Sequence, residues 1–277
     1  MNRYFTASLL ILFVFPCICA ATEFDRPWQD TTLAIILDPY HANRLNFERV
    51  QTDLRVAGII HKATQGLSLI DRKYAGRRLQ AKNRGFLWGS YHLLTNANIP
   101  HQIEHYLATV GIQSDETYAL DVECMTRSNN CADPSYEVSV SEVKEAMRLI
   151  KVRIGNFPML YTNDSNKAII AAELSQNAEF SDVRLWYARF RNNIASSFPD
   201  AFWESYTIWQ FSSEINCAPP PHPCPYRVSG TDYDMDLNIY AGSVSELRAM
   251  HVAYSYCQVA RVNGAAHLSR TNKKTEG

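Results

Sequence analysis

Eight short apolar segments recur along the chain, and each has the length and composition of a β-strand. They are residues 32–38, 56–63, 85–94, 117–123, 157–163, 183–190, 206–212 and 234–240. Nearly continuous hydrophobicity in segments of this length is typical of strands that are buried on both faces, as in parallel sheets. Eight such strands predict a closed barrel.

Polar segments with helical periodicity separate several of these strands. In residues 139–155, Ser139 and Glu142 form a capping-box pattern, apolar residues recur at helical spacing, and Gly155 marks the end. Residues 71–85 and 101–111 also fit amphipathic helices, whereas the connection between the last two strands is proline-rich and has no helical period. The alternation predicts an α/β fold with a parallel sheet, irregular because some helices are missing.

The two ends of the chain differ from this pattern. Residues 1–20 place one Arg before an apolar run that closes on small residues, which is typical of a secretory signal peptide, with an uncleaved anchor as the alternative. We expect residues 21–256 to form the barrel domain and the polar residues 257–277 to be a disordered tail. Since no later segment is apolar enough to span a membrane, we expect a secreted or periplasmic protein without membrane association after cleavage.

Charge and cysteine content narrow the possible partners. The formal net charge is −1 and no basic stripe is visible, which argues against nucleic acid as a partner. Cys124 with Cys131, and Cys217 with Cys224, form two C-x6-C pairs, and in an exported protein these predict two local disulfides. Zinc is the alternative, but it favours closer cysteines or histidines at ligand spacing, so we expect no metal and no cofactor.

Carboxylates and aromatic residues gather at the predicted strand ends, where a parallel barrel builds its functional face. Asp121 and Glu123 are one residue apart on a strand, so they point to the same side, and proximity raises the pKa of one of them. Such clusters suit carbohydrate hydrolysis, although each residue alone is compatible with core packing or strand capping. The residues at these ends are Asp38, Lys62, Gln65, Tyr91, His92, Asp121, Glu123, Tyr161, Asn163, Trp186, Trp209, Gln210, Asp236 and Asn238.

In their order and spacing, these motifs resemble the glycoside hydrolase family 25 lysozymes, which are N-acetylmuramidases. The resemblance extends from about residue 32 to residue 242. It implies a flattened, TIM-like (β/α) barrel with some helices missing, and hydrolysis of the β-1,4 bond between N-acetylmuramic acid and N-acetylglucosamine in peptidoglycan. We expect a monomer. The motifs are "HKATQG" (61–66), "GSYHLL" (89–94), "ALDVE" (119–123), "FPMLYTN" (157–163), "LWYARF" (185–190), "WQFS" (209–212) and "MDLNIYAG" (235–242).

The resemblance also implies roles for single residues. Glu123 corresponds to the general acid, Asp121 to its same-strand partner, and Asp38 and Asp236 to the other two carboxylates around the scissile bond. We expect Glu123 to hold a proton and Asp121 to stay ionised. The sequence leaves open whether a carboxylate or the acetamido group of the substrate attacks the sugar. The residues implied to bind substrate are Tyr91, Tyr161, Trp186, Trp209 and Gln65.

Two departures from the family pattern bear on substrate preference. Gln65 stands where the family usually has Glu, and Pro39 and Tyr40 directly follow Asp38. They keep open a peptidoglycan-binding protein without catalysis. A chitinase-like glycosidase is the other alternative, because such enzymes also have a D-x-E strand end like that of Asp121 and Glu123.

Overall fold

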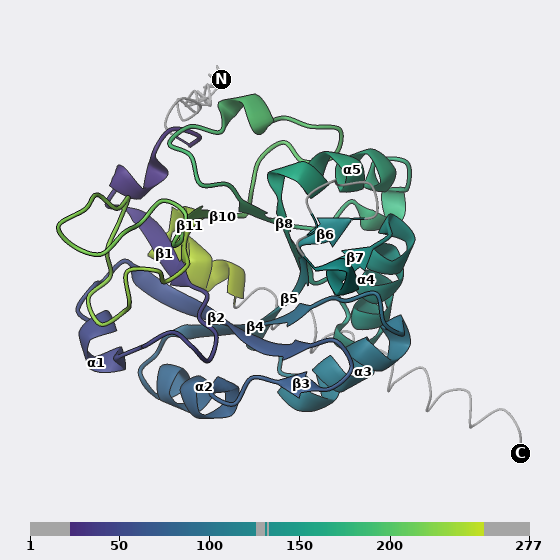
Figure 1. The fold of residues 1–277 in the computed structure, drawn as a ribbon, viewed down its shortest axis with the longest axis horizontal. Helices are drawn as coiled ribbons and strands as arrows, with labels where there is room; N and C mark the ends of the chain where they lie inside the picture. Colours follow the sequence, from purple (N-terminus) through teal and green to yellow (C-terminus); the bar gives the residue numbers. More distant parts are fainter. Residues whose placement is uncertain (1–22, 126–130, 132, 252–277) are drawn as a thin grey trace, which may run out of the picture.

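Eight strands pair edge to edge into a closed barrel (Figure 1). The structure is a computed structural model that describes residues 23–125, 131 and 133–251. Around the barrel the order is β1-β11-β10-β9-β8-β5-β4-β2, and β2 pairs with β1 to close it, which confirms the predicted TIM-like architecture. The strands are β1 (Leu33–Leu37), β2 (Val56–Gln65), β4 (Leu87–Leu93), β5 (Glu116–Val122), β8 (Met159–Asn163), β9 (Leu185–Ala188), β10 (Ile208–Ser212) and β11 (Leu237–Ser243).

The expectation of a parallel sheet is wrong for the last strand. β11 pairs antiparallel with both β10 and β1. No helix crosses back between β10 and β11 in residues 213–236, all of which the structure describes, so the chain re-enters the barrel at the end where β10 finishes. A strand joined in this way runs antiparallel to its predecessor. Asp236 therefore precedes β11 and yet lies at the barrel end where the parallel strands terminate.

Helices cover the outside of the barrel between the earlier strands (Figure 1). In α4, Ser139 and Glu142 form the predicted capping box and Gly155 ends the helix with a positive φ of 86°, a conformation that favours glycine. Only a short 3₁₀ turn separates β9 from β10 among the described residues, which confirms the missing helices. The α-helices are α1 (Phe47–Val50), α2 (Tyr74–Asn83), α3 (Ile99–Val110), α4 (Val140–Ile154) and α5 (Asp164–Leu174), and residues 244–251 are also helical.

The remaining elements are short. The 3₁₀ turns are η1 (Pro27–Gln29), η2 (Pro134–Tyr136), η3 (Ala178–Phe180) and η4 (Ala195–Ser197), and the short strands are β3 (Leu69–Ile70), β6 (Cys124–Met125) and β7 (Glu137–Val138).

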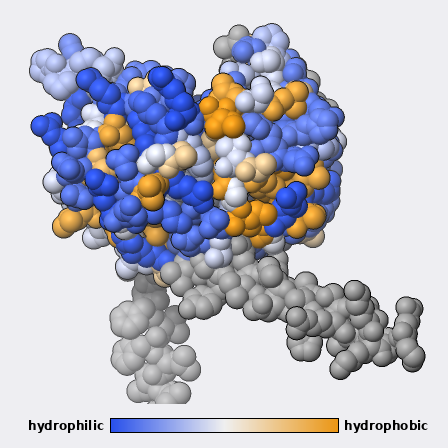
Figure 2. Space-filling model, turned by 90° about the horizontal axis from the view of Figure 1, so that it is seen from below, coloured by the Kyte–Doolittle hydropathy of each residue, from blue (hydrophilic) through white to orange (hydrophobic). Residues whose placement is uncertain are grey.

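Alternate side chains of each strand fill two separate cores. Ile36, Ile60 and Trp186 belong to the core inside the barrel, where Leu247 of the helical segment 244–251 also packs. Leu120 and Trp209 belong to the larger core outside it, with the residues of the helices. Seen from below Figure 1, the upper outline of the molecule is hollowed between two raised parts, at the end of the barrel where the parallel strands terminate (Figure 2).

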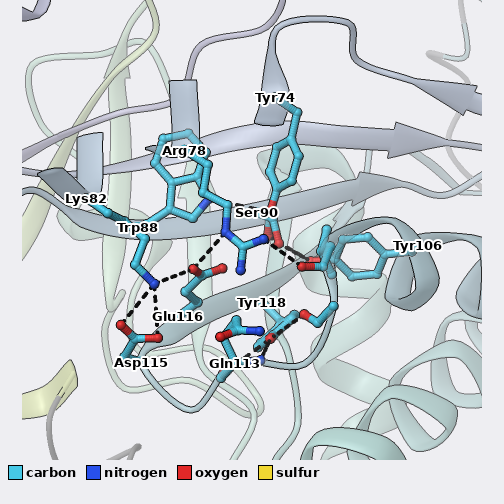
Figure 3. Close-up of polar contacts among 12 residues, drawn as sticks. Tyr74, Arg78, Lys82, Trp88, Ser90, Tyr106, Gln113, Asp115, Glu116 and Tyr118 are labelled. Atoms are coloured by element: carbon cyan, nitrogen blue, oxygen red, sulfur yellow. Dashed lines mark hydrogen bonds and ion pairs between the residues drawn. The ribbon is translucent and has the colours of Figure 1, made fainter. Parts of the chain in front are cut away.

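An ion-pair network fixes the start of β5, at the opposite end of that strand from Asp121 (Figure 3). The Glu116 side chain is buried, and its Oε1 accepts hydrogen bonds from Arg78 Nε at 2.9 Å and Lys82 Nζ at 2.7 Å. Lys82 also pairs with Asp115 at 3.0 Å. Because Arg78 and Lys82 both belong to α2, the network attaches this helix to the barrel.

Both predicted disulfides are present. Cys124 is bonded to Cys131, and Cys217 is bonded to Cys224, so the zinc alternative is wrong for these four residues. The predicted signal peptide (residues 1–20), Cys257 and the predicted tail (residues 257–277) lie outside the described residues. Among the residues that are described, no helix is both long enough and apolar enough to cross a membrane.

Candidate active site

Four carboxylates from three parts of the barrel meet at its C-terminal end. Asp38 directly follows β1, Asp121 lies within β5 and Glu123 directly after it, and Asp236 directly precedes β11. The charges of these groups alter one another's pKa values: Asp38 responds to Asp236 and Asp121, and Asp121 responds to Glu123 and Asp236. The fold therefore brings together all four residues that the sequence nominated as catalytic.

Asp38 is held by the side-chain amides of Gln210 and Asn238, which the sequence placed at strand ends without a role. Gln210 Nε2 donates to Asp38 Oδ2 at 2.8 Å, and Asn238 Nδ2 donates to Oδ1 at 3.0 Å. The amide oxygens are fixed in turn, because Tyr161 OH donates to Gln210 Oε1 at 2.8 Å and Trp186 Nε1 donates to Asn238 Oδ1 at 2.6 Å. Neither amide can flip without losing such a bond, so both oxygens of Asp38 are presented with donors.

The two amide donors act against burial at Asp38. Burial, and secondarily the charge of Asp236, raises the pKa of Asp38 well above its usual value, while the hydrogen bonds from Asn238 and Gln210 lower it. Since a carboxylate accepts two hydrogen bonds and a carboxylic acid is a poorer acceptor, the network favours the ionised form. These two amides, the amide clamp on Asp38, thus orient its carboxyl group and offset part of the rise in pKa that burial causes.

Asp121 lacks such support. Its side chain is 5% exposed, and its Oδ1 has no hydrogen-bond partner among the described residues. Burial, followed by the charge of Glu123, raises the pKa of Asp121 well above its usual value. Both effects act against the expectation that Asp121 stays ionised, which stays a prediction.

Glu123 keeps exposed surface, yet protein atoms crowd its carboxyl group. This desolvation raises the pKa of Glu123, as the sequence predicted, while the cation of Lys62 opposes the rise. Asn163 Nδ2 donates to the Glu123 backbone carbonyl at 2.9 Å and holds the end of β5 in place. Two neighbouring carboxyls with raised pKa values form a pair that titrates together.

The aromatic residues divide into those that line the site and those that lie beneath it. Tyr91 and Tyr161 are half-buried, and burial together with the charge of Asp121 raises the pKa of each well above its usual value, so both hydroxyls stay protonated. Trp186 lies below them, with ring centroids 6.1 Å from Tyr91 and 4.9 Å from Tyr161. Being 1% exposed, Trp186 does not reach a substrate, which corrects its predicted role to that of a support.

The prediction that Trp209 binds substrate is also corrected. Trp209 has 0% exposure, its Nε1 donates to the backbone carbonyl of Arg189 at 2.7 Å, and its ring meets Trp28 in the core outside the barrel. The cause is strand alternation: neighbouring residues face opposite sides, and Gln210 occupies the inside. The period-2 pattern of residues 208–212 carried this signal.

Gln65 contacts Lys62 rather than a carboxylate. Lys62 Nζ donates to Gln65 Oε1 at 2.7 Å, and Gln65 Nε2 donates to Tyr136 OH at 3.0 Å, which ties β2 to the η2 turn. The charge of Lys62 lowers the pKa values of both Asp121 and Glu123. The sequence placed Lys62 at a strand end but did not identify it as the cation that acts on this pair.

Asp236 carries a further cluster of acids beside it. Burial, and then the charges of Glu214 and Asp234, raises the pKa of Asp236 well above its usual value. Among the described residues, no group of three or more His, Cys, Asp and Glu side chains is arranged to hold a metal ion. Together, the four carboxyl groups can donate a proton and provide negative charge, and the hydroxyls of Tyr91 and Tyr161 lie at the same end of the barrel.

Comparison with known proteins identifies a matching family model and solved structures with a similar fold. The family model for glycosyl hydrolases family 25 matches residues 38–218, which is more than half of the chain. The crystal structure of the bacterial lysozyme from Streptomyces coelicolor is 21% identical, with a TM-score of 0.61 over 79% of this chain and 96% of that one. A family GH25 lysozyme from Aspergillus fumigatus has the same identity and TM-score, over 79% and 99%. YegX of Escherichia coli strain K12, an uncharacterized protein, is 22% identical over 74% of this chain and 68% of its own length.

Proposed function

Because the chain belongs to the glycosyl hydrolases of family 25, we propose that it is a muramidase. Its substrate is the β-1,4 bond between N-acetylmuramic acid and N-acetylglucosamine in peptidoglycan. The observation that carries the proposal is the convergence of Asp38, Asp121, Glu123 and Asp236, which affect one another's pKa values beside Tyr91 and Tyr161. The lysozyme and muramidase names of the similar structures support it.

Glu123 is the general acid in this proposal. A carboxyl group with a raised pKa retains its proton to a higher pH than an ordinary glutamic acid and can transfer it to the glycosidic oxygen as the bond breaks. The reaction needs one member of the Asp121–Glu123 pair protonated and the other charged. If the two carboxyl groups share a single proton, hydrogen bonds from the substrate decide which of them carries it.

The unpartnered oxygen of Asp121 supports a role for the acetamido group of the substrate. Its Oδ1 is buried and has no donor among the described residues, so it is a ready acceptor for an acetamido N–H. That hydrogen bond would stabilise ionised Asp121 and leave the shared proton on Glu123. The acetamido oxygen then attacks the anomeric carbon, while Asp38 and Asp236 provide negative charge beside the oxocarbenium-like sugar. In the second displacement, water that loses its proton to Glu123 attacks the anomeric carbon and breaks its bond to the acetamido oxygen, so that the anomeric configuration is retained.

The location of the enzyme is part of the proposal. Two disulfides are typical of proteins that fold in an oxidising compartment, and this supports secretion or a periplasmic site of action. The peptidoglycan substrate lies in that same region of the bacterial cell. That the protein acts as a monomer stays a prediction.

The release of reducing ends from purified peptidoglycan and from chitin tests the proposal. We expect wild-type protein to cleave peptidoglycan in preference to chitin, and Glu123→Gln to lose about 10²–10⁴-fold in turnover. Glu145→Gln, an exposed residue of α4, is the matched control and should retain activity. NMR of the first product should show the β-anomer.

Other outcomes decide between the alternatives. Equal turnover by wild type and Glu123→Gln would remove Glu123 from the mechanism. Preferential cleavage of chitin would favour the chitinase-like function, and tight binding without turnover would favour the non-catalytic one. An α-anomer as first product would contradict the acetamido route.

A further inference from the structure

A cationic groove is formed in part by chain segments that lead to the candidate active site. It has a volume of about 770 Å³ and is lined by the segment that leads into α1, by the start of α2 and by residues 230–232 before β11. On the left of Figure 2, which looks onto α2, the surface is mainly hydrophilic. The charged residues that line the groove are Arg44, Arg49, Arg72, Lys73, Arg77 and Asp232.

Most of the positive charge in the groove has no carboxylate partner. Asp232 pairs with Arg44, with Nε and Oδ1 2.7 Å apart. Arg49 and Arg72 are exposed, and neither forms an ion pair with any residue that the structure describes. Burial, followed by the charges of Arg77 and Arg72, lowers the pKa of Lys73, while the charges of Asp71 and Asp232 oppose this effect only in part. A concave surface with an excess of cations is complementary to an anionic ligand.

The fold creates this charge cluster from two distant segments. Arg44 and Arg49 flank the start of α1, and Arg72, Lys73 and Arg77 lie around the start of α2. The sequence contains no basic stripe, because these cations come together only in the fold.

Two of the chain segments that form the groove are continuous with segments that carry active-site carboxylates. Arg77 is buried, and its guanidinium donates to the carbonyls of Tyr40 at 2.9 Å and Asn43 at 2.5 Å, in the segment that begins at Asp38. The second segment, at Asp232, leads to Asp236 four residues later. Five residues of extended chain span at most about 18 Å, so Asn43 lies within that distance of Asp38. A short peptide attached to a sugar in the site can reach this far.

We propose that the groove binds the carboxylates of the peptide stems attached to N-acetylmuramic acid. This inference rests on the function proposed above. The stems are short peptides with several free carboxylates, whereas the N-acetylglucosamine units carry no charge. Guanidinium groups bind carboxylates through paired hydrogen bonds, and Arg49 and Arg72 have guanidinium groups available for them. The groove thus selects glycan that still carries its stems.

Sedimentation with purified sacculi tests the inference without requiring turnover. Arg49→Gln/Arg72→Gln is made in a Glu123→Gln background and mixed with intact sacculi or with sacculi whose stems an amidase has removed. We expect affinity for intact sacculi to fall about 5- to 10-fold, with affinity for stripped glycan unchanged. Added salt should reduce the difference.

Control variants separate charge from folding. Arg148→Gln/Arg153→Gln removes the same charge from α4, on another side of the barrel (Figure 1), and should bind both preparations like its parent. Arg49→Lys/Arg72→Lys keeps the charge and should restore most of the affinity for intact sacculi.

Three results would overturn the inference. They are an equal loss of affinity on both preparations, no loss on either, and stronger competition by tripolyphosphate than by a free stem peptide, which would identify a phosphate site. Failure of the proposed function has a different signature: wild-type protein would then release no reducing ends from stripped glycan, a substrate that does not engage the groove.

Discussion

Glu116 and Asp121 are carboxylates at the two ends of the same strand, and their surroundings differ. Both are buried, at 4% and 5% exposure, and each has one oxygen without a hydrogen-bond partner among the described residues. Glu116 is nevertheless neutralised by Arg78 and Lys82. The largest effect of a charge on the pKa of Asp121 comes from another acid, Glu123. The charge of Lys62 offsets that effect only in part. The two carboxylates therefore differ in whether cations neutralise them, and not in how deeply they are buried.

The contrast shows where the molecule is scaffold and where it is a site. A buried charge without a counter-ion costs stability, and a protein retains it where a ligand or a reaction supplies what is missing. At the start of β5, the ion pairs attach α2 to the barrel and nothing remains to be supplied. At the other end of β5, Asp121 Oδ1 remains free to accept a hydrogen bond from the substrate, and Asp121 and Glu123 share a proton.

The largest effect is expected from a substitution of Asp38, because its two oxygens both accept hydrogen bonds that a neutral amide cannot all accept. Asp38→Asn turns one acceptor into a donor that faces Gln210 Nε2 or Asn238 Nδ2. We expect turnover to fall about 10²–10³-fold through the lost charge, and the free energy of unfolding to fall by about 1–3 kcal/mol through the unmatched donor. Chemical denaturation and reducing-end release measure the two effects. Unchanged turnover would exclude Asp38 from catalysis.

A smaller effect, on stability alone, is expected at the scaffold end of β5. Glu116→Gln leaves Arg78 and Lys82 beside a neutral amide, and we expect a loss of about 2–3 kcal/mol, less than for fully buried pairs because both cations are partly exposed. Turnover per folded molecule should match wild type. If instead turnover fell while stability was retained, the division between scaffold and site would be wrong.

The smallest effect concerns the cation beside the site. Lys62→Met removes the charge that lowers the pKa values of Asp121 and Glu123, so both values rise further. The bell-shaped pH profile of kcat/KM should move to higher pH, with a loss of less than about tenfold at the new optimum. Gln65→Ala, which leaves the charge in place, is the control and should move the profile less. A shift to lower pH would show that Lys62 does not act on this pair.

The strands and the four carboxylates could be predicted because they depend on local patterns. Continuous apolar runs marked the eight strands, and period-2 spacing placed Asp121 and Glu123 on one side. The antiparallel β11 could not be read in this way, since its direction depends on which end of the barrel the connecting loop returns to. The burial of Trp209, by contrast, follows from strand alternation with Gln210 facing inward, and the period-2 pattern of residues 208–212 already contained it.

Contacts between distant segments were beyond the reach of sequence patterns. The amide clamp on Asp38 joins residues 172 and 200 positions apart. The cationic groove likewise depends on residues 44–49 meeting residues 72–77, although the chain is nearly neutral. Such features depend on the closure of the barrel, and composition does not record them.

Asp121→Asn tests the contrast between the two ends of β5 most directly, with unfolding free energy and turnover measured on the same sample. The pKa of Asp121 is raised in the folded state, so above the usual carboxyl pKa of about 4 the native state holds a proton that the unfolded state releases. The stability of the wild type therefore falls as pH rises through that window, and the variant escapes this loss.

We predict that Asp121→Asn is at least as stable as the wild type at pH 7, by up to about 1 kcal/mol, with this advantage absent at pH 3. Its turnover on peptidoglycan should fall about 10²–10³-fold. A variant that loses stability at pH 7 and keeps its turnover would contradict the assignment, because Asp121 would then be a scaffold carboxylate like Glu116.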